Sequence, residues 1–96
     1  MDLFEQPKRK VDREALNSPF MRIPRMKVQV ARDLIDLGLN DIFDLEGRSP
    51  EILFEDLRKL RPEVPKDRIG FLRMAVYFAE ACDPDPKKCH PLEWMD

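Results

Sequence analysis

Apolar residues recur at helical spacing between Lys27 and Leu37. Two overlapping sets, each with members three or four residues apart, make up this stripe: Val28, Ala31 and Ile35, and Val30, Leu34 and Leu37. The spacing predicts an amphipathic helix that turns one face to a core and leaves Arg32, Asp33 and Asp36 on the solvated arc. Gly38 supplies the left-handed position that favours glycine after a helix, so we expect the helix to end there.

A second helix is predicted to begin at Ser49-Pro50-Glu51. This tripeptide places a hydroxyl at the N-cap, a proline at the first helical position and a carboxylate near the positive end of the helix dipole. We expect the helix to run to about Leu60, with Leu53, Leu57 and Leu60 buried. Pro62 and Pro65 then break the chain.

The segment from Lys66 to about Cys82 is apolar on nearly every side after Gly70. A helix that is apolar all round is usually central, so we expect this one to be the core helix against which the others pack. Its aromatic residues, Phe71, Tyr77 and Phe78, are predicted to belong to the core.

Shorter elements are predicted at two places. Residues 12–23 are expected to be helical, but Pro19 interrupts them, so Ser18 and Pro19 restart a short helix that ends at Pro24. Asn40 is expected to cap a single turn through Leu45. The alternation typical of strands is absent, so the predicted fold class is all-α, with about five short helices.

One domain with tails is expected, because 96 residues can bury only one modest core. Residues 1–11 mix charge with Pro7 and lack periodicity, so we interpret them as a flexible basic arm. Residues 12–83 form the predicted helical domain. Residues 84–96 are predicted to be an irregular, proline-rich tail, packed on the domain through Leu92 and Trp94.

Charge is divided unequally along the chain. The formal net charge of the whole chain is −2, but residues 1–32 carry eight bases and four acids, whereas residues 33–96 carry nine bases and fifteen acids. A basic segment in an otherwise acidic chain hints at an anionic partner. The alternative is that both segments are ordinary solvated surface.

The sequence argues against membrane insertion, export and catalysis. No apolar stretch approaches the length of a membrane helix and no signal peptide is visible, so we expect a cytoplasmic protein in which Cys82 and Cys89 are free thiols. The only histidine, His90, lies in the tail, far from any pattern typical of nucleophilic catalysis. Cys82, Cys89 and His90 match no common zinc spacing, so we expect no enzyme and no cofactor or metal.

Three separated blocks carry a family resemblance. VARDLIDLGLNDIFDLEGRSPEILFEDL, DRIGFLRMAVYFAE and DPDPKKCHPLEWMD are similar, in order and spacing, to the small bacterial pathogenicity-locus or mitomycin-resistance-like proteins. The first block, with the segment before it, resembles a helix-hairpin-helix unit. The resemblance implies a helix-hairpin-helix (SAM-like) fold and sequence-independent DNA binding, with no small-molecule substrate.

The chain departs from the helix-hairpin-helix pattern in the hairpin. That pattern reads apolar-Pro-Gly-apolar-Gly, whereas the matching residues are Ile23-Pro24-Arg25-Met26-Lys27. Glycines allow positive φ and a close approach of backbone amides to phosphate, so Arg25 and Lys27 follow such a path at a conformational cost. A compensating anion site is predicted at the start of the next helix. No residue typical of an N-cap precedes this helix, so its first amides lack a side-chain acceptor, and Arg22, Arg25 and Lys27 surround them.

Two functions follow from these patterns. The first is a DNA-binding module whose contact residues are Arg22, Arg25, Met26, Lys27, Val28 and Arg32, joined by Lys8, Arg9 and Lys10 of the arm. The second is a protein-interaction or dimerisation module that has lost DNA binding. The missing glycines and the acidic remainder of the chain favour the second, and basic residues in place of glycine favour the first.

Overall fold

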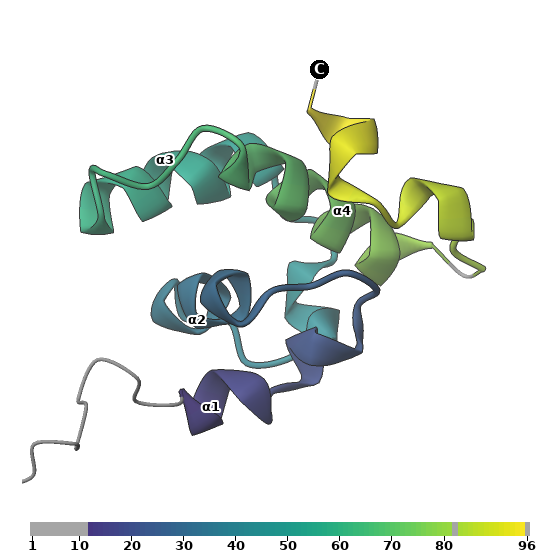
Figure 1. Cartoon of the computed structure of the whole chain (residues 1–96), viewed down its shortest axis with the longest axis horizontal. Coiled ribbons are helices and arrows are strands. Elements are labelled where there is room, and N and C mark those ends of the chain that lie inside the picture. The colour runs from purple at the N-terminus through teal and green to yellow at the C-terminus, as the bar shows by residue number, and fades with distance from the viewer. Residues whose placement is uncertain (1–11, 82, 96) are drawn as a thin grey trace, which may run out of the picture.

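Helices make up all the regular structure in the part of the chain that the structure covers. The structure is a computed structural model that describes residues 12–81 and 83–95, and no strand occurs within them (Figure 1). The predicted all-α class is therefore confirmed. In the described residues, four α-helices and four 3₁₀ turns replace the expected five helices: α1 (Arg13–Leu16), η2 (Pro19–Arg22), α2 (Val28–Asp36), η3 (Ile42–Leu45), α3 (Pro50–Leu60), α4 (Arg68–Glu80), η4 (Pro86–Lys88) and η5 (Pro91–Trp94).

Local capping explains most of the helix boundaries. The Ser49 hydroxyl accepts a hydrogen bond from the Ile52 amide at 3.3 Å, which confirms the predicted start of α3. Gly38 has a φ of +93°, as expected for the residue that closes α2. The cap of η3 is Asp41 and not Asn40, because the Asp41 carboxylate accepts from the Ile42 amide at 2.6 Å.

The predicted central helix is confirmed, since six consecutive or nearly consecutive residues of α4 are buried. Helix α3 packs on α4 and buries Leu53 and Leu57, whereas α1 packs on α2 in the other half of the molecule (Figure 1). Leu60 remains 54% exposed, so its predicted burial is wrong. It is the last residue of α3, and the backbone becomes extended at Arg61 directly after it.

The C-terminal tail is ordered against α4 by short turns. Trp94 packs 5.4 Å from the Tyr77 ring, and its indole N–H donates to the Lys88 carbonyl at 2.8 Å. Leu92 is 69% exposed, so of the two predicted anchors of the tail only Trp94 packs on the domain. Gly70 makes this packing possible, because a Cβ there would lie 2.5 Å from Met95 Sδ and 2.8 Å from the Pro91 carbonyl oxygen.

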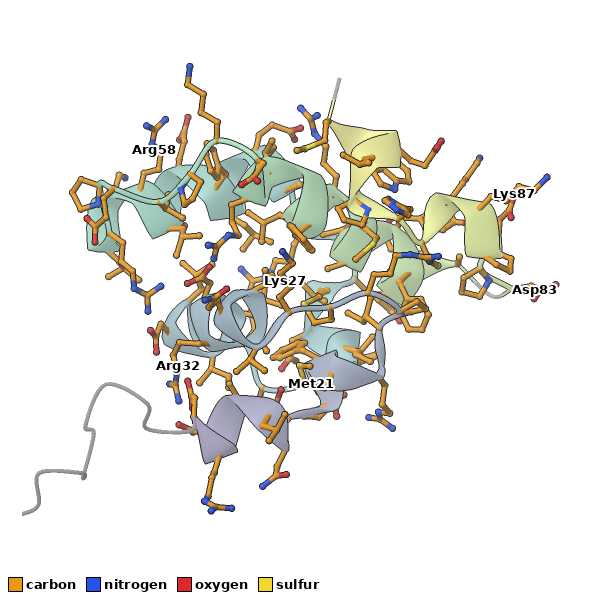
Figure 2. The ribbon with its side chains drawn as sticks, in the orientation of Figure 1. Met21, Lys27, Arg32, Arg58, Asp83 and Lys87 are labelled. Atoms are coloured by element: carbon orange, nitrogen blue, oxygen red, sulfur yellow. The ribbon has the colours of Figure 1, made fainter. Side chains whose placement is uncertain are left out.

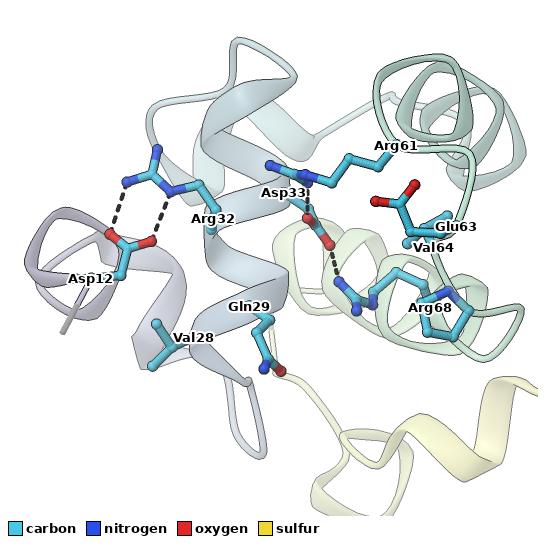
Figure 3. A pocket seen from close by; sticks show the side chains of 10 residues that line it. Asp12, Val28, Gln29, Arg32, Asp33, Arg61, Glu63, Val64 and Arg68 are labelled. Carbon is cyan, nitrogen blue, oxygen red and sulfur yellow. Dashed lines mark hydrogen bonds and ion pairs between the residues drawn. The ribbon is translucent and has the colours of Figure 1, made fainter. Parts of the chain in front are cut away.

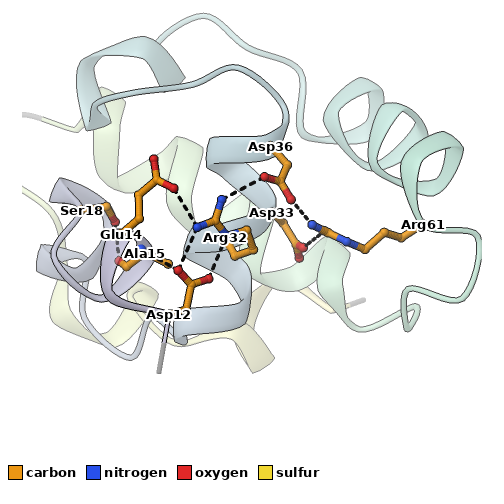
Figure 4. Close-up of polar contacts among 8 residues, drawn as sticks. All are labelled: Asp12, Glu14, Ala15, Ser18, Arg32, Asp33, Asp36 and Arg61. Carbon is orange, nitrogen blue, oxygen red and sulfur yellow. Dashed lines mark hydrogen bonds and ion pairs between the residues drawn. The ribbon is translucent and has the colours of Figure 1, made fainter. Parts of the chain in front are cut away.

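A network of ion pairs connects the two halves (Figure 4). Asp33 is 3% exposed and binds both Arg61, which follows α3, and Arg68, which begins α4. The expectation that Asp33 is a solvated residue of α2 is therefore wrong. Burial raises the pKa of the Asp33 carboxyl, and the charges of Arg68 and Arg61 oppose that rise.

Candidate nucleic-acid interface

Residues 23–26 form a tight turn ahead of α2. The Met26 amide donates to the Ile23 carbonyl at 3.2 Å, with Pro24 and Arg25 at the two central positions. Arg25 has a φ of +62° and is the only non-glycine residue with positive φ among the described residues. Proline followed by a residue with positive φ is the pattern of a type II turn, in which the second position favours glycine. Arg25 thus adopts the strained conformation. Lys27 has an ordinary extended φ of −107°, so the conformational cost predicted for Lys27 is wrong.

Strain at Arg25 can be measured by comparing two substitutions. We expect Arg25→Gly to be more stable than Arg25→Ala by about 1 kcal/mol, because both remove the side chain but only alanine keeps the left-handed penalty. Chemical denaturation of both variants gives the difference. Equal stabilities would show that position 25 carries no backbone strain.

The start of α2 lacks a side-chain cap, as the sequence indicates. Lys27 occupies the N-cap position, and no side chain accepts from the first turn of the helix. The amides of Val30 and Ala31 donate to the Lys27 carbonyl, which leaves those of Val28 and Gln29 without an acceptor among the described residues. These two N–H groups lie at the positive end of the helix dipole and can donate to an anion.

Two predicted basic residues, Arg25 and Lys27, lie at this helix start, and a third, Arg22, precedes the turn. Lys27 extends from the start of α2 toward α4, and its ammonium lies 5.6 Å from the centre of the Phe71 ring (Figure 2). Arg25 donates one N–H to the Cys89 carbonyl in the tail at 3.2 Å. Arg22 is mostly exposed and has only a loose contact of 3.9 Å with Asp41.

The remaining predicted contacts point elsewhere. Met26 is 8% exposed and belongs to the core, so it offers only backbone to a ligand, and the half-buried Val28 packs against the same core. Arg32 turns toward α1, where it binds Asp12 at 2.8 Å, and it also binds Glu14 and Asp36 (Figure 4). Lys8, Arg9 and Lys10 lie outside the described residues.

Arg32 acts as a structural residue in this arrangement. Its hydrogen bonds to Asp12 lower the pKa of that carboxyl to about 2, helped by a hydrogen bond from the Ala15 amide. A guanidinium that already contacts three carboxylates has few donors left for a phosphate. Arg32 is therefore a structural residue and not a phosphate contact in the proposed interface.

A cavity of about 860 Å³ runs along α2 (Figure 3). Three arginines line it, but three acids line it too. Asp33 binds Arg61 and Arg68, and Arg32 binds Asp12, so the charges are paired within the wall. Such a surface has little net attraction for an anion.

A smaller cavity of about 330 Å³ lies between residues 25–27 and the tail, and two residues for which no role in binding was predicted, Asp67 and His90, line it. Beside it, Cys89 is 2% exposed. Burial raises the pKa of the Cys89 thiol, Asp85 adds to the rise and Arg25 opposes it. A protonated, buried thiol is a poor nucleophile.

Two classes of site are not found in the described residues. No group of three or more His, Cys, Asp or Glu side chains is placed to hold a metal ion there. Among the same residues, no helix has both the length and the apolar character needed to cross a membrane.

The fold and the site define a small all-α domain that presents a basic turn in front of an uncapped helix. A family model described as Cdd1, Pathogenicity locus, matches residues 13–96. Because this match covers most of the chain, the protein belongs to the pathogenicity-locus family, which confirms that part of the resemblance. Comparisons with curated proteins and with solved structures found no match.

Proposed function

We propose that the protein is a sequence-independent DNA-binding module of the helix-hairpin-helix type. In this proposal α1 and η2 form the first helical part, residues 23–26 form the hairpin, and α2 is the second helix. Phosphates bind at the turn and at the start of α2, where backbone amides and basic side chains meet. A compact all-α domain with a tight turn between two helical segments supports this architecture.

One observation carries the proposal. Arg25 and Lys27 flank the uncapped start of α2, and neither forms an ion pair with a carboxylate of the described residues. The bases of the neighbouring network differ, because Arg32, Arg61 and Arg68 all bind carboxylates. Bases that stay uncompensated beside unpaired amides are the arrangement expected for a phosphate contact.

A salt titration tests the proposal. If Arg22, Arg25 and Lys27 are the main contacts, the logarithm of the binding constant for a short duplex falls against log salt with a slope of about −2.7. Participation of Lys8, Arg9 and Lys10 would steepen the slope to about −5.4. Fluorescence anisotropy with two duplexes of unrelated sequence gives both the slope and the lack of sequence preference. Absence of binding even at low salt would refute the proposal.

The alternative, a protein-interaction or dimerisation module, draws on a different feature. Phe43 is 72% exposed and Ile52 is 58% exposed, so both apolar side chains are accessible to a partner. Trp94 offers this alternative no support, because it packs against Tyr77 of its own chain. Sedimentation of the same samples distinguishes the two functions, since self-association needs no DNA.

A further inference from the structure

The small cavity between the hairpin and the tail brings together residues that are distant in the sequence. Arg25 and Lys27 line it from the hairpin, Asp67 and Phe71 from the start of α4, and His90 from the tail. Its volume of about 330 Å³ is at the small end of the usual range for ligand pockets. A cavity of this size suits a compact group rather than a whole nucleotide.

The hairpin supplies the positive charge of the cavity. The Arg25 guanidinium uses one N–H on the Cys89 carbonyl, so most of its five donors remain. The Lys27 ammonium lies over the Phe71 ring and has no hydrogen bond or ion pair within the described residues. The hydrogen bond to the Cys89 carbonyl therefore positions the Arg25 guanidinium and leaves its other N–H donors available to a ligand.

His90 adds a donor from the tail. Its Nδ1 accepts a hydrogen bond from the Leu92 amide at 3.2 Å. A neutral imidazole with an acceptor at Nδ1 carries its proton on Nε2, so the ring that lines the cavity has a free N–H. A ligand with acceptor oxygens would satisfy this N–H.

Asp67 and Phe71 modify the electrostatic potential of the cavity. Asp67 is the only carboxylate of the lining, and its side chain does not cap α4. One negative charge against those of Arg25 and Lys27 leaves a net positive cavity. Phe71 is 8% exposed, and its apolar ring beside the two bases strengthens their attraction for an anion.

We propose that this cavity binds a single phosphate group, held by Arg25, Lys27 and the Nε2–H of His90, and that the tail completes the site. The shared chemistry is a tetrahedral phosphate oxyanion, which can come from a DNA backbone or from free phosphate. The DNA source rests on the proposed function above, whereas the free-phosphate source does not. The tail thus contributes to binding and does more than cover the core.

Nuclear magnetic resonance titration of the full chain tests the site. We expect inorganic phosphate to shift the backbone amide signals of residues 25–28 and 89–92, and sodium chloride at equal ionic strength to leave them in place. The same signals should shift with a short duplex if the source is DNA. Equal shifts in chloride, or shifts confined to other residues, would overturn the proposal.

Two substitutions at the cavity have opposite expected effects. His90→Asn keeps a side-chain acceptor for the Leu92 amide, but its N–H donors lie nearer the backbone than the histidine Nε2, so phosphate affinity falls about two- to tenfold. Asp67→Asn removes the one opposing charge, so affinity rises about threefold. Effects of the same sign, or no effect of either, would show that the cavity is not the binding site.

Gly70→Ala tests the contribution of the tail without changing any charge. A Cβ at this position would collide with the Pro91 carbonyl and with Met95, so the tail must move while α4 gains a better helix former. We expect the phosphate-induced shifts at Arg25 and Lys27 to decrease severalfold. Undiminished shifts, with the Met95 signal displaced, would show that the hairpin binds phosphate alone.

The two proposals can fail separately. Duplex binding that needs Arg25 and Lys27 but is unchanged in His90→Asn and Asp67→Asn overturns the cavity and leaves DNA binding standing. Phosphate shifts with the expected response to both substitutions, together with no duplex binding, support the cavity and refute DNA binding.

Discussion

Asp33→Ala is expected to lower the free energy of unfolding by about 3 kcal/mol or more. Asp33 is 3% exposed and binds both Arg61 and Arg68, so its removal leaves two partly buried guanidinium groups without this partner. Breaking a buried ion pair by removing one member typically costs about 3–5 kcal/mol. Urea denaturation followed by circular dichroism measures the loss.

Asp36→Ala provides the matched control for this prediction. Asp36 lies one turn further along α2 and also binds Arg61, but its side chain is 31% exposed. Exposed ion pairs contribute about 1 kcal/mol or less, so the control should lose much less stability than Asp33→Ala. Similar losses in the two variants would contradict a special role for the buried carboxylate.

The double substitution Arg25→Glu with Lys27→Glu is expected to weaken duplex binding about a hundredfold or more at low salt. Each base is assigned one phosphate contact, and a hydrogen bond to a charged group contributes about 1.5–3 kcal/mol. With Arg22 as the only remaining contact, the slope against log salt should fall from about −2.7 to about −0.9. Anisotropy titrations at several salt concentrations measure both quantities.

Arg58→Glu with Lys59→Glu is the control for charge alone. Both bases are exposed near the end of α3, and Arg58 lies far from Lys27 in the view of Figure 2. Each pair of substitutions changes the formal net charge from −2 to −6. Equal weakening by the two double variants would mean that overall charge, and not the hairpin, governs binding.

Features specified by local sequence were predicted well. The spacing of apolar residues and the caps at Ser49 and Gly38 set α2 and α3 to within a residue or two, because helix periodicity and capping act over a few neighbouring positions. The exposure of Leu60 was not predicted, because it is not set by neighbouring residues. Whether a helix end touches the core depends on where the chain goes next.

The polar contacts could not be predicted, because their partners are distant in the sequence. Arg61 and Arg68 lie 28 and 35 residues from Asp33, and no local sequence pattern predicts that they bind it. For the same reason the sequence could not show that Asp12, 20 residues away, engages Arg32.

The candidate site was predicted in part. The helix-hairpin-helix pattern expects glycine at the position of Arg25, which indicated an unusual backbone there, and the positive φ at Arg25 confirms that backbone conformation. The approach of the tail remained hidden, since the hydrogen bond from Arg25 to Cys89 spans 64 residues. No role in binding was predicted for His90 or Asp67, because only folding places them beside residues 25–27.

The two ion pairs of Asp33, with Arg61 and with Arg68, affect how the protein unfolds. One carboxylate in α2 binds both ends of the segment that connects α3 to α4, so neither half can swing away without exposing an unpaired charge. Local fluctuations between the halves are thereby suppressed, and the protein should melt as a single cooperative unit. Amide protons in α2 and α4 would then exchange with solvent deuterium through the same global event.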